Sequence, residues 1–178
     1  MIHRKVLMVQ SRQDSRPVGA ECTLEIEIEN ESEHIPFDLE KARRTVRMVL
    51  EGEKIVCGRL EVTIIGDPAI HRLNVQFLGH DYPTDVLAFE LDRDVDSGFL
   101  EGNVIVSDDT ALDRAREFGW APENELLLYI IHGTLHLAGY DDHAKEDERA
   151  MRAKEREYMA KAGIETIAAP GELGKKEA

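Results

Sequence analysis

The segment from Pro122 to Leu137 constrains the fold most, because it has the pattern of a helix that is apolar on nearly every face. Pro122 suits a first helical turn, and Glu123 and Glu125 lie at the positive end of the helix dipole. The aliphatic residues that follow are Leu126, Leu127, Leu128, Ile130, Ile131, Leu135 and Leu137. A helix without a polar face must be covered on several sides, so we expect it at the centre of the fold.

The remaining periodicity predicts an α+β fold, with a small mixed β-sheet and helices packed on it. Alternating or continuous apolar residues indicate strands at 23–30, 60–65, 86–91 and 102–107. Capping residues, prolines and glycines delimit further helices at 38–51, 67–77, 108–118 and 145–162. Ser107, Asp108 and Asp109 are interpreted as helix caps rather than as a second metal site. We predict a lead-in over 1–22, a single domain over 23–165 and a flexible tail over 166–178.

Composition indicates an ordinary globular protein, since 178 residues can bury one core and 42% of them are hydrophobic. The apolar run from Val6 to Val9 is too short for a signal peptide, and no run approaches the length of a membrane span. Cys22 and Cys57 are far apart in the sequence and outside any Cys-x-x-Cys pair. We therefore expect reduced cysteines, no thiolate metal ligands, no membrane partner and a cytoplasmic location.

The net charge of −14 argues weakly against a nucleic-acid partner, because phosphate binding usually requires a basic surface. Basic residues do gather locally, at Lys41, Arg43, Arg44 and Arg47. Charge runs of this kind are more often solvated helix faces than binding sites, and we interpret this one in the same way.

His132 and His136 are spaced i,i+4 in the apolar helix, so both imidazoles leave the same helix face. Gly139 can take the positive φ that ends a helix, and the turn after it brings either Asp142 or His143 back as a third ligand. Two buried histidines could instead bond to backbone carbonyls. We favour a zincin-like metal site on the central helix, because buried polar rings without partners are costly. Three nitrogen or oxygen ligands with an open fourth position are typical of one catalytic Zn²⁺ ion.

Gly133 restricts the chemistry of this site. In zinc peptidases with a His-Glu-x-x-His motif, the residue after the first histidine is the glutamate that acts as general base, and here it is glycine. We therefore expect hydrolysis of a phosphodiester rather than a peptide. His132 and His136 would act through metal-bound water, whose pKa the ion lowers to about 7, and no organic cofactor is expected.

The run from His132 to Asp141, His-Gly-x-Leu-His-Leu-x-Gly-Tyr-Asp, resembles the signature of the endoribonuclease YbeY family. Leu73-Asn74, Asp81, the run from Pro83 to Phe89 and the strand from Gly102 to Ser107 are also similar to that family. The resemblance implies a zinc-dependent endoribonuclease of the cytoplasm that is specific for single strands. It also implies a role in 16S ribosomal RNA 3′-end maturation and ribosome quality control, with ribosomal RNA and the small ribosomal subunit as partners.

The chain departs from the family pattern at two positions. The family's third histidine ligand falls at Asp142, which we favour on register, with His143 as the alternative ligand. The family's arginine after Leu-Asn falls at Leu78, and His80 is a candidate substitute contact for the substrate. The missing arginine leaves open a second function, in which the protein is a non-catalytic, zinc-containing assembly factor that binds the small ribosomal subunit.

Overall fold

The computed structural model describes residues 6–8 and 22–166, and within them the chain forms five strands and five helices. The strands are β1 (Val6–Met8), β2 (Leu24–Asn30), β3 (Cys57–Ile65), β4 (Val86–Asp94) and β5 (Phe99–Ser107). The helices are α1 (Leu39–Gly52), α2 (Asp67–Leu78), α3 (Asp108–Phe118), α4 (Pro122–Leu137) and α5 (Lys145–Lys161). Most of the predicted lead-in and almost all of the predicted tail lie outside the described residues.

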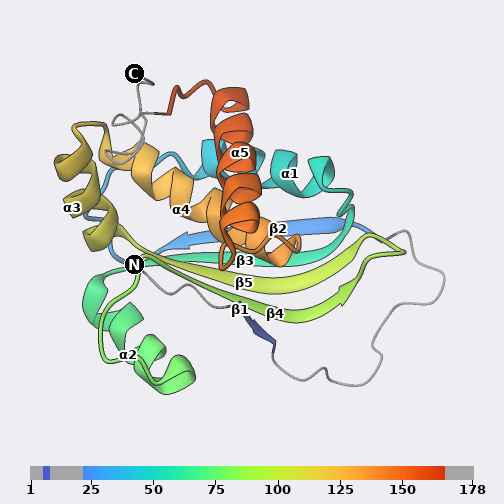
Figure 1. The fold of residues 1–178 in the computed structure, drawn as a ribbon, viewed down its shortest axis with the longest axis horizontal. Coiled ribbons are helices and arrows are strands. Elements are labelled where there is room, and N and C mark those ends of the chain that lie inside the picture. The colour runs from blue at the N-terminus through green and yellow to red at the C-terminus, as the bar shows by residue number, and fades with distance from the viewer. Residues whose placement is uncertain (1–5, 9–21, 167–178) are drawn as a thin grey trace.

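The five strands form one mixed sheet in the order β1-β4-β5-β3-β2. The pairs β1–β4, β2–β3 and β3–β5 are parallel, whereas β4 and β5 form an antiparallel hairpin. Helices α1, α3, α4 and α5 cover one face of this sheet, and α2 lies on the other face (Figure 1). The predicted α+β class with a small mixed sheet is confirmed.

Helix α4 lies at the centre of the main core, as its apolar pattern predicts. Twelve of its sixteen residues are buried. It packs closely on the sheet at Gly133, where an added Cβ would lie 2.6 Å from Val104 Cγ1 and 2.9 Å from Val86 Cγ2. Although α4 is strongly apolar, no helix of the described residues has both the length and the hydropathy of a membrane span.

Several strands differ from the sequence prediction in extent. β3, β4 and β5 are longer than expected because ladder pairing continues past the clearly apolar residues into charged ones such as Arg93 and Asp94. β1 was not predicted, and it contributes an edge strand that pairs with Ala88 to Glu90 of β4. Three residues are too few to show a strand period, so this pairing had no sequence signal.

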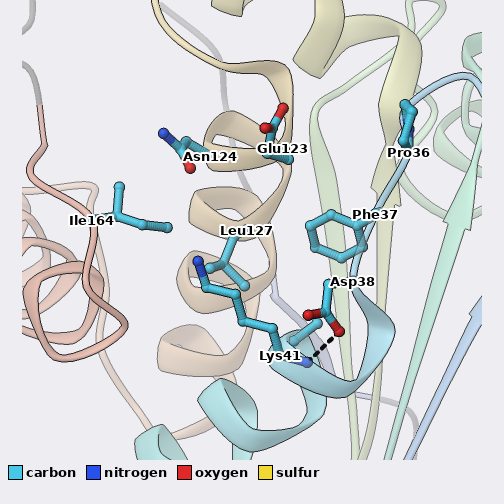
Figure 2. Close-up of a pocket in the computed structure, with 9 residues that line it drawn as sticks. Pro36, Phe37, Asp38, Lys41, Glu123, Asn124, Leu127 and Ile164 are labelled. Atoms are coloured by element: carbon cyan, nitrogen blue, oxygen red, sulfur yellow. Dashed lines mark hydrogen bonds between the residues drawn. The ribbon is translucent and has the colours of Figure 1, made fainter.

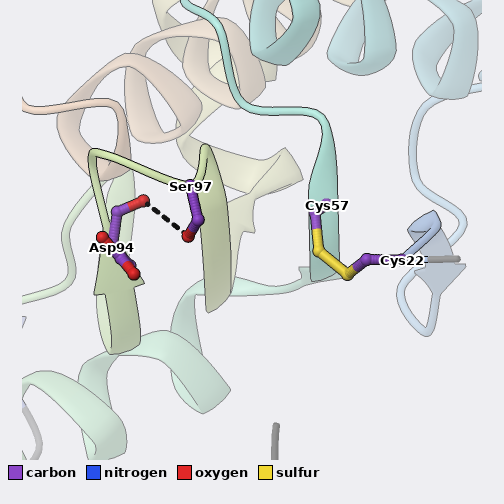
Figure 3. The surroundings of a disulfide bond; sticks show 4 residues. All are labelled: Cys22, Cys57, Asp94 and Ser97. Carbon is purple, nitrogen blue, oxygen red and sulfur yellow. Dashed lines mark hydrogen bonds between the residues drawn. A yellow bond between two sulfur atoms is a disulfide. The ribbon is translucent and has the colours of Figure 1, made fainter. Parts of the chain in front are cut away.

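The expectation of two separate, reduced cysteines is wrong in this structure, where Cys22 and Cys57 form a disulfide bond (Figure 3). The two residues are 35 positions apart in the sequence, but their Cα atoms are 5.4 Å apart. The cause is the parallel register of β2 and β3, in which Leu24 pairs with Gly58. That register places Cys57, the first residue of β3, beside the residues that lead into β2.

Candidate metal centre

His132 and His136 lie in the last turns of α4, and their imidazole rings are adjacent. The ring centroids are 4.4 Å apart, and the ring planes are nearly perpendicular. Both residues are buried, at 1% and 5% exposure. Two polar rings of this size inside a hydrophobic core require polar partners, and the positions of those partners define the site.

Asp142 supplies the third side chain of the cluster. Helix α4 ends at Leu137 with Ala138 as its C-cap, and Gly139 takes a φ of 100°, so the chain turns back over the helix end. The Asp142 carboxylate then lies 3.8 Å from His132 Nε2 through one oxygen and 3.8 Å from His136 Nε2 through the other. One ligand atom from each of the three residues lies within 4.8 Å of the others.

His143, the alternative third ligand, lies outside this group. Its Nδ1 contacts the Asp141 carboxylate, and about half of its side chain is exposed. The hydrogen bond from His143 lowers the pKa of Asp141. The structure therefore brings Asp142, rather than His143, to the two buried histidines.

The Nδ1 atom of each buried histidine is held by a separate acceptor. His132 Nδ1 donates to Glu155 Oε1 at 2.5 Å, and His136 Nδ1 donates to the Tyr140 carbonyl at 3.0 Å. A carbonyl oxygen only accepts, so the proton of a neutral His136 is on Nδ1 and the lone pair is on Nε2. Outer contacts of this kind fix the tautomer and orientation of histidines that bind metals.

Glu155 is a buried carboxylate, at 3% exposure, between His132 and Arg152. Its second oxygen accepts from Arg152 Nη1 at 2.9 Å. Burial opposes ionisation of Glu155, but the hydrogen bond and charge of His132, together with Arg152, outweigh it and lower the pKa. The negative charge beside His132 makes this imidazole a stronger electron donor towards a cation at Nε2.

A second polar network fixes the turn that carries Asp142. The Tyr140 and Tyr158 hydroxyls both donate to the Glu53 carboxylate, which also pairs with Lys154 Nζ at 2.8 Å. Burial of Glu53 raises its pKa, but these hydrogen bonds have the larger combined effect and lower it. The end of α1 is thus linked through Glu53 to α5 and to the turn after α4.

The Ala138 carbonyl at the end of α4 accepts from Arg93 Nη2 at 2.8 Å. The Arg93 guanidinium lies over Gly139, where an added Cβ would be 2.7 Å from Nη1. A side chain at position 139 would therefore collide with Arg93, in addition to the strain of a positive φ. This contact satisfies a free helix carbonyl and stabilises the start of the turn.

The donor chemistry of the cluster fits a divalent metal ion. A tetrahedral ion with bonds of about 2.0–2.2 Å holds its ligand atoms about 3.3–3.6 Å apart. The carboxylate–imidazole distances of 3.8 Å are close to that value, so small side-chain movements would complete the geometry. His132, His136 and Asp142 can therefore hold a metal ion, with the 18% exposed side chain of Asp142 on the solvent side.

The second family-like segment has a structural role around β4. Thr84 and Asp85 are buried, and Asp85 Oδ1 accepts from the Val86 backbone and from Thr84 Oγ1. His80 follows α2, and its ring stacks on Tyr82 with the centroids 5.4 Å apart. Leu78, at the family arginine position, packs against the small apolar cluster beneath α2.

Sequence reasoning missed Glu155 and Glu53. The many charged residues of α5 suggest an exposed helix, yet its Met151, Glu155, Tyr158 and Met159 are buried. These positions recur at helical spacing, so the two methionines and the tyrosine indicated a buried face that includes Glu155. Glu53 carried no such signal, because it follows Gly52 at the end of α1.

A cavity of about 230 Å³ lies elsewhere, between the start of α1 and the first turns of α4 (Figure 2). Phe37, Lys41, Asn124 and Ile164 are among its lining residues. None of the three clustered residues lines it. The candidate metal centre is therefore a polar site at the end of α4, separate from this cavity.

Comparison with known proteins identifies the family of the chain. Residues 27–163 match the family model described as Endoribonuclease YbeY. A relative of that name from Chloroherpeton thalassium is 37% identical over 121 residues, which is 68% of this chain and 84% of the relative. Another, from Bacillus licheniformis, is 31% identical over 153 residues, which is 80% of this chain and 97% of the relative.

The fold also occurs among solved structures. The solution structure of TM1509 from Thermotoga maritima superposes with a TM-score of 0.55 at 30% sequence identity, and it covers 82% of this chain and 98% of that one. The family model spans most of the chain, including α4, the turn after it and α5. The chain belongs to the endoribonuclease YbeY family.

Proposed function

We propose that this protein is a metal-dependent endoribonuclease that cleaves single-stranded RNA at a Zn²⁺ ion held by His132, His136 and Asp142. The observation that supports it most is the convergence of two imidazole Nε2 atoms and one carboxylate within 4.8 Å. Bound there, the ion would supply Lewis acidity and a nucleophile at neutral pH. The family relatives named as endoribonucleases support RNA as the substrate.

The chain's own residues hold and orient this centre. Glu155 fixes the ring of His132, and the Tyr140 carbonyl fixes that of His136, so both Nε2 atoms are presented without rearrangement. Gly133 has no proton-carrying side chain, and it packs directly on Val104 and Val86. A glutamate at that position has no room, which disfavours the peptidase mechanism.

Two arginines beside the centre are candidate contacts for RNA phosphates. Arg93 lies over Gly139, and Arg152 pairs with Glu155 while 43% of its side chain is exposed. Arginine suits phosphate oxygens because its planar guanidinium can donate two parallel hydrogen bonds. We propose that they take part of the role of the family arginine absent at Leu78. His80, stacked on Tyr82, is a proposed contact on which an RNA base can stack.

We extend the proposal to 16S ribosomal RNA 3′-end maturation, ribosome quality control and binding of the small ribosomal subunit in the cytoplasm. This extension rests on the resemblance to the family. The Cys22–Cys57 disulfide removes cysteine usage as an argument for that location. The net charge of −14 predicts that RNA binding depends only weakly on salt, because few cations are available to neutralise phosphates and few counterions are released on binding.

RNA cleavage by matched histidine variants tests the nuclease. The zinc-loaded wild type should cut a single-stranded RNA oligonucleotide, and a chelator should stop the reaction. His136→Ala should lose at least 100-fold in rate, whereas His143→Ala should stay within about threefold, since His143 is exposed and paired with Asp141. Asp142→Ala should be inactive and Asp142→His active, because histidine also donates one lone pair to zinc. Equal rates in the wild type and His136→Ala would contradict the proposal.

The alternative function, a non-catalytic assembly factor, is favoured by Leu78 and by the acidic charge. It predicts that the zinc-loaded wild type binds small-subunit particles without cleaving RNA. Sedimentation of those particles with the wild type and with His136→Ala separates the two functions. Binding by both proteins, with no RNA cleavage by either, would replace the nuclease proposal with the assembly role.

A further inference from the structure

We propose that His34, Asp108 and Asp109 form a second metal site, suited to a divalent transition-metal ion such as Zn²⁺. The site is separate from the cluster at the end of α4 and does not depend on the nuclease proposal. One ligand atom from each of the three residues lies within 4.8 Å of the others. Three segments that are distant in the sequence meet there: the loop after β2, the start of α2 and the start of α3.

The position follows from the sheet topology. Strands β2, β3 and β5 are parallel neighbours, so their carboxyl ends share one edge of the sheet. His34 follows β2, Asp67 follows β3, and Asp108 follows β5 directly. Ligand sites of sheets with parallel strands form at this edge, outside the carboxyl ends of the strands.

The two aspartates do not cap α3, the helix that they begin, which revises their interpretation from the sequence. Ser107 caps α3 by accepting from the Thr110 backbone at 3.1 Å. Asp108 Oδ2 accepts from the His34 backbone at 3.0 Å, and Asp109 Oδ2 accepts from the Asp67 backbone at 2.9 Å. Each carboxylate is therefore anchored through one oxygen, which orients the other oxygen.

Both remaining oxygens are directed at His34 Nδ1. Asp109 Oδ1 lies 2.8 Å from it, Asp108 Oδ1 lies 3.5 Å from it, and Ser32 Oγ lies 3.2 Å from it. The Asp108 separation lies within the distance of about 3.3–3.6 Å between the ligands of a tetrahedral ion, and the two shorter separations would have to widen by a few tenths of an ångström. The backbone hydrogen bonds that anchor the carboxylates act as the outer contacts that metal ligands require.

Asp108 gives a second, independent indication of a ligand. Its side chain is fully buried, and among the described residues its Oδ1 has no hydrogen-bond partner. A buried carboxylate oxygen without a hydrogen bond lowers the stability of the fold, and a bound cation would supply the missing partner. The 54% exposed side chain of His34 and the 31% exposed side chain of Asp109 leave a path for the ion and its water ligands.

The donor set selects the class of ion. Imidazole nitrogen suits zinc and similar transition metals, and carboxylates also bind them, whereas Mg²⁺ prefers oxygen ligands and retains its water. An ion here would link the loop after β2 to the start of α3. We infer that the ion has a structural role, because it would hold these two segments together at the carboxyl ends of β2 and β5.

Zinc binding by full-length variants tests the site. The double variant His136→Ala/Asp142→Ala removes the first cluster, and calorimetric titration with Zn²⁺ should then find one remaining ion per chain. Adding His34→Ala or Asp109→Asn should weaken that binding at least tenfold. Asp108→Asn keeps an oxygen for the His34 backbone and should weaken it similarly, and circular dichroism checks the fold of each variant.

His71→Ala is the matched control, because His71 Nε2 also pairs with an exposed aspartate, Asp81, at 2.9 Å. It should leave zinc affinity unchanged, and Mg²⁺ in equal amount should not compete. No saturable zinc binding in the double variant would overturn the proposal. Equal affinity with and without His34 would also overturn it, and would show that His34 only donates a hydrogen bond to Asp109.

Discussion

Replacing Gly133 with alanine should destabilise the fold, although alanine is the better helix former. The new Cβ would lie 2.6 Å from Val104 Cγ1 and 2.9 Å from Val86 Cγ2, both inside the closest approach of real carbon atoms. Helix propensity should contribute about 1 kcal/mol in favour of alanine. Overpacking in a rigid core costs about 1–3 kcal/mol. The new methyl group would collide with side chains of both β4 and β5, so we expect Gly133→Ala to lower the free energy of unfolding by about 1–2 kcal/mol.

A double-mutant cycle isolates the collision. Val104→Ala alone removes two buried methyl groups and should cost about 2 kcal/mol in unfolding free energy. In Gly133→Ala/Val104→Ala the new methyl enters the vacated space, so the double variant should be more stable than the sum of the singles by about 1 kcal/mol or more. Urea unfolding followed by circular dichroism measures each value.

Ile70→Val serves as the control partner, because Ile70 is buried on α2 in the cluster on the opposite face of the sheet. Its effect should add to that of Gly133→Ala within about 0.5 kcal/mol. A stabilising Gly133→Ala, or strict additivity with Val104→Ala, would refute the claim that the glycine is required for contact between α4 and the sheet. It would also remove the steric argument against a glutamate at this position.

Three further predictions concern the residues around the metal centre. Glu155→Gln should lower zinc affinity by about 10–100-fold, because outer partners of histidine ligands have effects of that size. Competition with a chromophoric chelator measures this affinity. An unchanged affinity would mean that Glu155 does not orient His132. Tyr140→Phe should lower the unfolding free energy by about 1–3 kcal/mol in urea, since its hydroxyl donates to the charged Glu53 carboxylate; no loss would show that this bond does not stabilise the turn. Because the pKa of Glu53 is lowered in the folded state, its charged form contributes stability that is present at neutral pH and lost as pH falls below about 4.5. The stability difference between wild type and Glu53→Gln should therefore shrink in acid, and a difference that is constant from pH 7 to pH 3 would contradict the shift.

The sequence predicted the elements whose signal is local. Helix α4 has an apolar pattern that only a central helix can have, and the i,i+4 spacing of His132 and His136 placed both rings on one face. Gly139 was expected to end the helix with a positive φ, and it has one. The alternation of β2 also predicted which side chains are buried.

The contacts that the sequence did not predict depend on tertiary packing. The bond between His132 and Glu155 joins residues 23 positions apart, and it forms because α5 packs against α4. The Cys22–Cys57 pair depends on the register of β2 with β3. The choice between Asp142 and His143 depended on one residue of turn length; register favoured Asp142, and only the folded turn shows that its carboxylate faces the two histidines. The meeting of His34 with Asp108 likewise required the order of the parallel strands.

The most direct test of the account is anomalous X-ray diffraction at the zinc edge from crystals of the zinc-loaded protein. We predict a strong peak within about 2.0–2.2 Å of His132 Nε2, His136 Nε2 and an Asp142 oxygen. A strong peak coordinated by His143 in place of Asp142 would contradict the ligand set. The absence of any peak at the end of α4 in fully loaded crystals would contradict the metal centre itself.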